Sequence, residues 1–489
     1  METTRPRATE HTGGNITIDL PIGEIVGANF DLGNAVCSHG LFMMAPNKWD
    51  PHSKTLARPL RLNSDGDYDS PSVNVQISHP EDTPSALRLR VFDVEFLSNN
   101  QKQSLMDQVR RMLRLSKEEE QNVREFQEMY IEAKKKGFGR LFRSPTLFED
   151  MVKCILLCNC QWSRTLSMAR ALCELQMELK SPLLGSPVCE ANNCSASRNR
   201  VADIDQFLPK TPVGKEVKRR NGTRKDSSLS AISNAEVEKD VSVNIDCAEI
   251  SGFHRLDKQG TSFHMRTDKN IYMPFDDSST LAESAGVNLN LISDANSSEI
   301  AHDYSSNYIG NFPSPAELVS IDENILANRC KLGYRAKRII SLARTIVEGR
   351  IQPKQLEQAC SRPSVSIYNK LADQLKEIEG FGPYTCANVL MCMGFYHVIP
   401  SDSETIRHIK QVHKRNSDIR TIGQDVEVIY GKFAPFQYLV YWSEVWSFYE
   451  ERFGRLRQMI YSDYKLITAT NLIPKTPAKQ KKNKRIKLT

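Results

Sequence analysis

The fold of this chain is decided by residues 371–409, which read LADQLKEIEGFGPYTCANVLMCMGFYHVIPSDSETIRHI. Leu371, Leu375 and Ile378 recur at helical spacing and predict a first helix with one apolar face. A glycine-rich turn follows, and after it comes a second apolar stretch. We therefore interpret the segment as a helix, a tight hairpin and another helix.

The predicted hairpin is built from Gly380, Phe381 and Gly382. Glycine ends a helix readily because it turns sharply without the steric penalty of a Cβ atom. Pro383 suits the first position of the next helix, where its missing N–H costs nothing. Such a turn leaves backbone N–H groups free at the start of the second helix. They can bind a phosphate without any side chain and without sequence preference.

A third helix is predicted after Ile399-Pro400-Ser401-Asp402, where a new helical spacing of apolar residues begins. Asp402 would thus lie at a helix N-terminus. One interpretation is an ordinary helix cap, because Ser401 and Glu404 have the spacing of a capping box. The other is a functional carboxylate close to a phosphate-binding turn.

The sequence GFGPYTCA at residues 380–387, followed by IPSD at residues 399–402, resembles the helix-hairpin-helix (HhH-GPD) DNA glycosylase superfamily. The resemblance lies between the alkyladenine and 8-oxoguanine branches. It implies an enzyme of base excision repair that flips a damaged base out of duplex DNA and cleaves its N-glycosidic bond. It also implies that Asp402 is catalytic. The residues that it assigns to DNA binding at the hairpin are Gly380, Phe381, Gly382, Tyr384 and Thr385.

The second residue after Gly382 separates the subclasses of this family. Bifunctional relatives have a lysine there, whose amine attacks the sugar and leads to strand cleavage. This chain has Tyr384, and no lysine occurs between Lys376 and Lys410. The resemblance therefore implies a monofunctional enzyme that leaves an abasic site. Alkyladenine glycosylases use an aromatic residue here to stack on an electron-poor base, so Tyr384 is expected in the base pocket. Family members close this pocket with a C-terminal helix, so Trp442, in the predicted helix at residues 433–453, is expected there too, although it also fits a core role.

Another motif points to the oxidised-guanine branch. Gly333-Tyr334-Arg335-Ala336 resembles a motif of the 8-oxoguanine glycosylases, in which the Tyr-Arg pair contacts the base opposite the lesion. Gln161 falls near the position from which relatives fill the gap left by the flipped base. Tyr334, Arg335 and Gln161 are therefore expected to contact DNA, although each also fits a structural role. Between the two substrates we favour an alkylated purine, because a pocket residue should decide base choice more than a contact on the opposite strand.

The chemistry of the reaction explains why a carboxylate is needed. Breaking an N-glycosidic bond builds positive oxocarbenium charge on the deoxyribose. A carboxylate beside the sugar stabilises this charge and can orient or deprotonate the attacking water. Helix dipoles at Asp402 would help to hold it ionised. No metal or cofactor is expected.

The pattern along the chain predicts an α+β fold, in which a small antiparallel β domain precedes an all-α glycosylase core with a long insertion. Alternation in Val73-Asn-Val75-Gln-Ile77 and in Leu87-Arg-Leu89-Arg-Val91 predicts strands. A long polar segment without periodicity predicts disorder. The predicted parts are a disordered N-terminus (1–15), the β domain (16–99), the first part of the core (100–177), the disordered insertion (178–310), the second part of the core (311–465) and a basic disordered tail (466–489).

Composition adds limits on location and partners. The 489 residues contain no apolar run of transmembrane length, and the first residues lack the core of a secretory signal, so a soluble intracellular protein is expected. Twelve cysteines lack paired metal-type spacing, which indicates reduced thiols, and none follows Cys392, where some relatives carry an iron–sulfur loop. Net charge is only +6, but seven lysines and arginines between Lys475 and Lys487 indicate a solvated tail, a nuclear import signal or a DNA-binding arm.

The sequence thus predicts a monomeric, nuclear DNA glycosylase that binds double-stranded DNA with a damaged base and does not bind membranes. The competing class is a non-catalytic helix-hairpin-helix DNA-binding protein. Such a protein would keep the hairpin and the basic tail, but it would not need Asp402, Tyr384 or Trp442.

Overall fold

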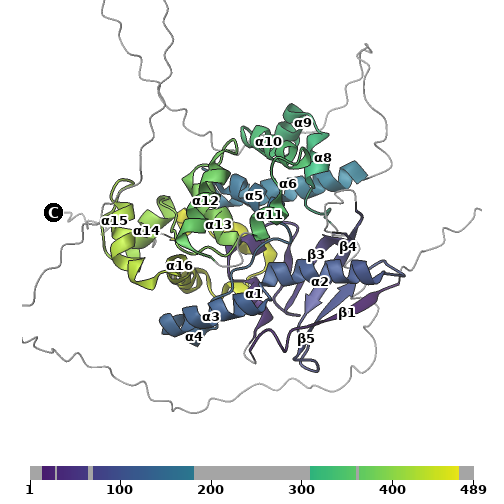
Figure 1. Cartoon of the computed structure of the whole chain (residues 1–489), viewed down its shortest axis with the longest axis horizontal. Helices are drawn as coiled ribbons and strands as arrows, with labels where there is room; N and C mark the ends of the chain where they lie inside the picture. Colours follow the sequence, from purple (N-terminus) through teal and green to yellow (C-terminus); the bar gives the residue numbers. More distant parts are fainter. Residues whose placement is uncertain (1–13, 28–29, 64–69, 181–308, 359–362, 473–489) are drawn as a thin grey trace, which may run out of the picture. The chain divides into compact units, whose positions relative to one another are not determined.

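A computed structural model describes residues 14–27, 30–63, 70–180, 309–358 and 363–472 (Figure 1). The fold is α+β, as the sequence predicts, with one antiparallel sheet followed by helices. The predictions of disorder for the N-terminus, the insertion and the basic tail fall mostly outside the described residues, but residues 178–180 and 466–472 are described and are helical in part.

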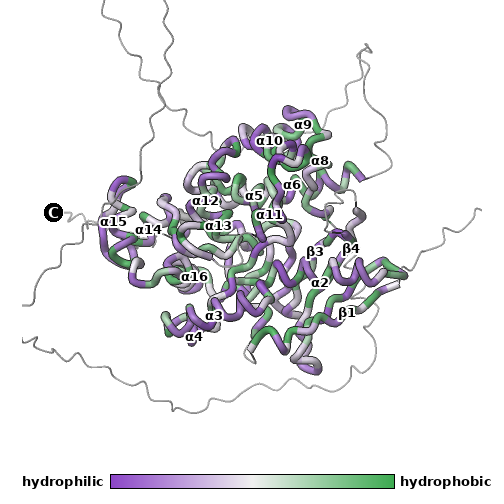
Figure 2. Tube along the Cα trace, viewed as in Figure 1, coloured by the Kyte–Doolittle hydropathy of each residue, from purple (hydrophilic) through white to green (hydrophobic). Residues whose placement is uncertain are grey.

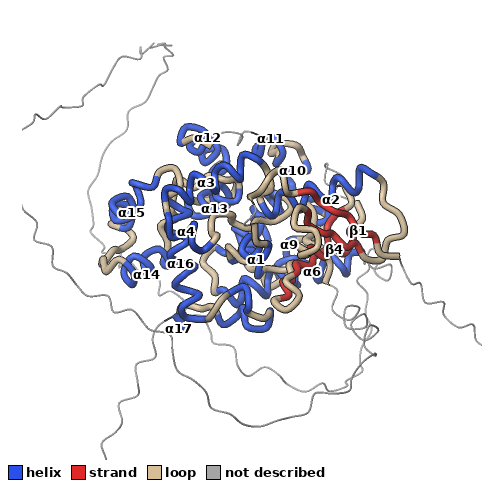
Figure 3. The backbone as a smooth tube through the Cα atoms, turned by 90° about the horizontal axis from the view of Figure 1, so that it is seen from below, coloured by secondary structure: helices blue, strands red, loops and turns tan. Residues whose placement is uncertain are grey.

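The N-terminal region forms a five-stranded antiparallel sheet with the strand order β1-β5-β4-β3-β2. Its strands are red in Figure 3. Both strands predicted from alternation are confirmed, and they pair with each other so that Ile77 lies opposite Leu89. The strands are β1 (Ile16–Pro21), β2 (Lys48–Asp50), β3 (Thr55–Arg61), β4 (Ser72–Ser78) and β5 (Ala86–Val91).

Two short helical elements, α1 (Leu32–Val36) and η1 (Gly40–Met43), interrupt the strand pattern between β1 and β2. The sequence predicts only strands and turns here. The reason is that apolar residues run almost continuously through both elements and are buried on all sides, so no helical or strand period is visible. These elements matter because η1 reaches the candidate site.

The remaining described residues are mainly helical. The longer elements are α2 (Asn99–Leu113), α3 (Lys117–Met129), α4 (Ile131–Lys136), α5 (Leu147–Leu157), α6 (Trp162–Lys180), α8 (Pro315–Val319), α9 (Glu323–Arg329), α10 (Arg335–Val347), α11 (Pro353–Gln358), α12 (Val365–Lys376), α13 (Pro383–Cys392), α14 (Ser403–Val412), α15 (Ile422–Tyr430) and α16 (Gln437–Phe453). Short elements follow or connect them: η3 (Gly431–Phe433), η4 (Leu456–Gln458), η5 (Tyr461–Leu466) and α17 (Ala469–Leu472). None of the described helices is long and apolar enough to cross a membrane.

Helix α5 is the centre of the helical core and packs against α6, α10 and α13 (Figure 2). Every residue from Leu147 to Leu156 is buried, including three charged ones. Glu149 pairs with Arg58 of β3 at 2.9 Å, which ties the sheet to this helix. The helix begins after Thr146, whose side chain accepts the Glu149 N–H at 3.2 Å.

The two parts of the core that flank residues 181–308 are joined by direct contacts. Near the end of α6, Gln176 donates to Glu317 at 3.0 Å and accepts the backbone N–H of Asn311 at 2.9 Å. Gly310 approaches the α6 backbone so closely that a Cβ atom there would lie 2.4 Å from the Cys173 carbonyl oxygen. Farther along, the buried Arg114 guanidinium donates to the carbonyl oxygens at the end of α13 at 2.9 and 3.0 Å.

Candidate active site

The predicted hairpin is present between α12 and α13 (Figure 1). Gly380 has φ +89°, which favours glycine, and a Cβ atom there would lie 2.3 Å from Cδ of Arg338. Gly382 caps α13 in an extended conformation, with Pro383 at the first helical position as predicted. A Cβ atom at Gly382 would meet nothing within 4 Å among the described residues. Glycine is therefore needed at the two positions for different reasons. Gly380 makes the turn, and Gly382 leaves open space in front of the helix N-terminus.

Asp402 is the N-cap of α14, and its Oδ1 accepts the backbone N–H of Thr405 at 2.8 Å. The Thr405 hydroxyl donates to the carbonyl oxygen of Pro400 at 2.7 Å and lies 3.0 Å from the Tyr441 hydroxyl. These contacts fix the loop before the helix and with it the direction of the carboxylate. The predicted capping box of Ser401 and Glu404 is not formed. Glu404 instead accepts a hydrogen bond from Tyr449 at 2.7 Å and pairs with Arg407.

Burial raises the pKa of Asp402, and the amides of Thr405 and Glu404 only partly oppose this rise. The expectation that helix dipoles hold Asp402 ionised is therefore wrong in direction, because desolvation is the larger effect. A carboxylate with a raised pKa is a stronger base, which suits proton abstraction from water.

A cavity of about 1210 Å³ opens beside Asp402. Most of the residues that the sequence singles out lie around it. They are Gln161, Gly380, Phe381, Gly382, Tyr384, Thr385, Asp402 and Trp442. Of these, Thr385 is buried and its hydroxyl lies 3.2 Å from the Cys158 sulfur, so its side chain is not free to contact DNA.

One wall of the cavity is aromatic and comes from α16. Trp442 stacks on Tyr438 with ring centroids 6.0 Å apart and planes within 10°, and it lies 5.8 Å from Trp446. The Trp442 Nε1 donates to the carbonyl oxygen of Ser38 at 3.0 Å, which fixes the indole. Tyr384 of α13 also lines the cavity. Burial and the nearby Asp402 raise its pKa, so its phenol stays protonated.

His39 also lines the cavity, although nothing in its local sequence signals this. It caps η1, and its Nδ1 accepts the Leu41 N–H at 3.4 Å, which places the ring proton on Nε2. Its ring centroid lies 4.6 Å from that of Trp442. Burial, with a smaller contribution from Arg114, lowers the pKa of His39 to about 3. His39 is therefore a neutral ring that extends the aromatic wall, and only its contact with a distant helix reveals the role.

Tyr334 and Arg335 are not among the residues that line the cavity. Arg335 is 3% exposed, and its guanidinium donates to the carbonyl oxygens of Cys158 and Asn159. The expectation that Arg335 faces DNA is therefore corrected: it holds the loop that precedes Gln161. Tyr334 is 50% exposed and packs under Arg338, which lines the cavity. The sequence analysis did not single out Arg338, because Arg335 and Lys337 precede it closely and nothing local marks which basic residue faces a cavity.

No family model matches the sequence, and no curated protein matches it. Among solved structures, the chain is similar to a 3-methyladenine DNA-glycosylase from Archaeoglobus fulgidus, at 13% identity over 90% of this chain and 99% of that one, with a TM-score of 0.44. It is also similar to MBOgg1 in complex with a low-affinity DNA ligand, at 15% identity over 89% and 97% of the two chains, with a TM-score of 0.42. A third similar structure is the 8-oxoguanine glycosylase/lyase of Clostridium acetobutylicum, at 11% identity over 82% and 98%, with a TM-score of 0.37.

Proposed function

We propose that this protein is a DNA N-glycosylase of base excision repair, which hydrolyses a damaged base from duplex DNA. The observation that supports this most strongly is the convergence of three features on one cavity. A buried carboxylate, an aromatic wall and the free N-terminus of α13 all line it. A non-catalytic DNA-binding module would need only the last of these.

The hairpin is suited to hold the DNA backbone. The first amides of α13 have no partner within their own helix, as at any helix N-terminus, and the space in front of Gly382 is open. A phosphate placed there would accept these amides and interact favourably with the helix dipole. This contact is independent of sequence, as an enzyme that scans DNA for damage requires.

The aromatic wall is suited to receive a base turned out of the helix. Extruding a base costs a few kcal/mol, and the cost is smallest for a damaged or mispaired base. Stacking on an aromatic side chain stabilises the extruded base by about 1–3 kcal/mol. Tyr384, Trp442 and His39 can supply this surface, because all three line the cavity beside Asp402.

Asp402 is placed for the chemical step. In the proposed reaction its carboxylate stabilises the oxocarbenium charge and takes a proton from the water that attacks the sugar. The raised pKa makes it a better base than an exposed aspartate. The hydrogen bond to Thr405 fixes one carboxylate oxygen and so orients the other.

We further propose that the enzyme is monofunctional. Tyr384 stands where a lysine would form the covalent imine, and a phenol cannot form one. Lys376 is the one lysine among the described residues that line the cavity. It is exposed and pairs with Asp373 at 2.8 Å. That ion pair raises the pKa of Lys376 and keeps its amine protonated, which makes it a poor nucleophile.

The favoured substrate is an alkylated purine. Such a base is electron-poor or cationic, and the electron-rich faces of Tyr384 and Trp442 attract it. The alternative, oxidised guanine, rested on the Tyr334-Arg335 motif. That alternative is weaker because Arg335 is buried against backbone carbonyls.

The test is single-turnover cleavage of duplexes that contain a 3-methyladenine analogue, hypoxanthine, uracil or 8-oxoguanine. Wild type is compared with Asp402→Asn and with Asp322→Asn, a matched control at the exposed N-cap of α9. We expect cleavage of an alkylated purine only after hot alkali, loss in Asp402→Asn and no change in the control. Strand cleavage without alkali, or a covalent adduct trapped by borohydride, would refute the monofunctional assignment. Binding without cleavage of any duplex would favour the DNA-binding module.

The nuclear location is a separate proposal. It is supported by the lysine-rich segment between Lys475 and Lys487, which lies outside the described residues. A fluorescent fusion with these basic residues replaced by glutamine should stay outside the nucleus, whereas the wild-type fusion should enter it.

A further inference from the structure

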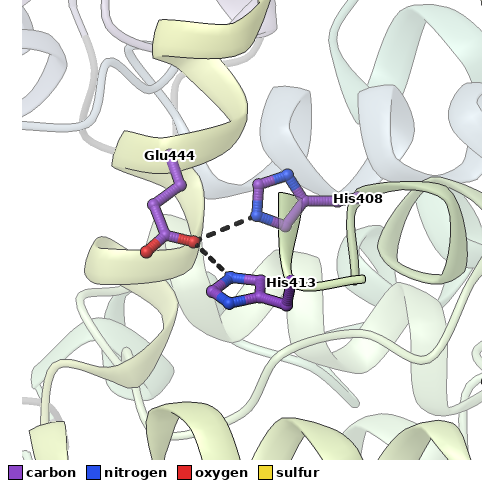
Figure 4. A group of neighbouring side chains, drawn as sticks. All are labelled: His408, His413 and Glu444. Atoms are coloured by element: carbon purple, nitrogen blue, oxygen red, sulfur yellow. Dashed lines mark hydrogen bonds and ion pairs between the residues drawn. The ribbon is translucent and has the colours of Figure 1, made fainter. Parts of the chain in front are cut away.

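Four side chains converge behind the aromatic wall, at the ends of α14 and α15 and in the middle of α16. Figure 4 shows His408 of α14, the adjoining His413 and Glu444 of α16, with both rings directed at one carboxylate oxygen. Tyr430, the last residue of α15, completes the group. The His408 side chain is fully buried, and those of His413 and Glu444 are about one-fifth exposed.

The donor atoms of this cluster lie very close together. Oε2 of Glu444 is 3.1 Å from Nε2 of His408, 2.9 Å from Nε2 of His413 and 2.6 Å from the Tyr430 hydroxyl. The Tyr430 oxygen is in turn 3.2 Å from the His408 nitrogen and 2.9 Å from the His413 nitrogen. The nitrogen and carboxylate donors all lie within 4.8 Å of one another. Five of the six edges of a small tetrahedron are thus at contact distance.

Hydrogen bonding alone does not account well for this arrangement. Two neutral imidazoles and one phenol can direct three protons into the cluster, whereas the four atoms make five close contacts. At least two of the five contacts therefore have no proton of their own and depend on a proton that is shared between two acceptor atoms. Lone pairs that converge in this way are the arrangement that a bound cation stabilises.

The chemistry of the donors also suits a cation, because a carboxylate and two imidazole nitrogens are common ligands of divalent metal ions.

We propose that His408, His413, Glu444 and Tyr430 bind one Zn²⁺ ion in a tetrahedral structural site. Two imidazole nitrogens and two oxygens are a donor set that zinc accepts. Ligand distances of about 2.0–2.1 Å require about 3.3 Å between donors. The observed contacts of 2.6–3.2 Å therefore need to open by about 0.1 to 0.7 Å. Tyr430 would bind as phenolate after releasing its proton to solvent, and the buried site would then be electrically neutral.

The proposed ion would brace the frame of the cavity without taking part in the reaction. It would join the C-terminal end of α14 to α15 and α16. Asp402 begins the same α14, and Trp442 precedes Glu444 on the same α16. Zinc binding does not depend on the proposed glycosylase activity, so either can fail without the other.

The experiment measures metal binding by the full chain. The protein is stripped with a chelator, and Zn²⁺ and Co²⁺ are titrated by equilibrium dialysis and by cobalt absorption. The variants are His413→Ala and Glu444→Gln, which change partly exposed groups and so spare the buried ring of His408. His52→Ala is the matched control, because this histidine is exposed and lies far from the cluster in sequence.

We expect one equivalent of Zn²⁺ per chain, a tetrahedral cobalt spectrum without thiolate bands, and release of a proton on binding. His413→Ala and Glu444→Gln should each weaken binding by about 100-fold or more, since outer-shell changes alone cost 10- to 100-fold. The control should bind like wild type, and chelation should lower the Tm of wild type but not of His413→Ala. Substoichiometric binding, wild-type affinity in both variants, or thiolate bands that place the metal on cysteines would overturn the proposal.

Discussion

Trp442 donates its indole N–H to the carbonyl oxygen of Ser38 at 3.0 Å, and its ring contacts His39, the next residue. The last long helix of the core is thereby fixed to a short turn of the N-terminal β region. The pocket wall is therefore shared between the two regions, and the β region does more than support the helices. Changes near His39 should alter base recognition, although they lie far in sequence from the hairpin and from Asp402.

Asp402 serves both as a helix cap and as the proposed base, and two substitutions separate these roles. Asparagine caps a helix as well as aspartate, so Asp402→Asn should keep the Tm of wild type. It removes a carboxylate whose pKa is raised by burial, so at neutral pH stability should stay equal or rise slightly. Asp402→Ala loses the bond to Thr405 and should cost about 1 kcal/mol. Both should abolish base release, as thermal unfolding and single-turnover assays on one preparation would reveal.

The rate of base release should depend on the ionisation of Asp402. Because the pKa of Asp402 is raised, the carboxylate is lost at a higher pH than for an ordinary aspartate. The single-turnover rate should thus increase with pH through a midpoint above 3.8, and it should level off once the group is ionised. The rate of spontaneous base loss, measured with Asp402→Asn at each pH, is subtracted from the wild-type rate. A midpoint at or below the usual value would contradict the desolvation argument.

The two hairpin glycines should respond differently to alanine. Gly380→Ala forces a side chain into a left-handed conformation against Arg338 and should destabilise the fold by about 1–3 kcal/mol. Gly382→Ala adds a methyl group to open space and should leave the free energy of unfolding nearly unchanged. If a phosphate occupies that space, the loss of charge-assisted bonds worth about 1.5–3 kcal/mol should weaken DNA binding roughly 10- to 100-fold. Equal DNA affinity in Gly382→Ala would place the backbone elsewhere.

Arg335 and Arg338 offer a matched pair for the DNA interface. Arg335→Ala leaves the carbonyl of Asn159 without its donor and the carbonyl of Cys158 with only the Tyr334 hydroxyl at 3.3 Å, and it should cost about 1–3 kcal/mol of stability. The salt dependence of its DNA binding should not change. Arg338→Ala should reduce the slope of log Kd against log salt by about one, as expected for one lost phosphate contact. Fluorescence anisotropy at several salt concentrations measures both slopes, and an identical slope for Arg338→Ala would exclude that contact.

The buried His39 should make stability depend on pH. Its pKa is lowered from 6.5 to about 3, so the unfolded chain binds a proton that the folded chain does not. The free energy of unfolding should therefore fall as pH decreases below 6.5, by at most about 1.4 kcal/mol per unit from this residue. His408 acts in the same direction, so the test is a difference. Urea unfolding of His39→Gln between pH 7 and 5 should show a shallower decline than wild type.

Local patterns in the sequence were enough to predict the hairpin, the strands β4 and β5 and the position of Asp402. Period-two alternation in β4 and β5, the glycine spacing at 380–382 and the proline after it each act through neighbouring residues, which a sequence displays directly. The cap of α14 is equally local, because the sequence already places Asp402 at the start of this helix. These features follow from steric and hydrogen-bonding rules that span a few residues.

The features that could not be predicted all depend on distant contacts. His39 belongs to the site only because Trp442 packs on it. Arg335 is turned inward because two carbonyls of the loop before α6 accept its protons. The direction of the Asp402 pKa depends on how deeply the surrounding elements bury it, and a helix dipole argued from sequence alone omits that cost.

The bonds of Gln176 have a consequence for the long segment that separates the two parts of the core. One amide side chain holds both Asn311 and Glu317, so the chain leaves α6 and returns at nearly the same place. The described core itself thus holds together the two points at which residues 181–308 are attached, and the entropic cost of closing a connection rises only slowly with its length. We therefore expect that a short flexible linker in place of residues 181–308 leaves the positions of Asp402 and the aromatic wall unchanged.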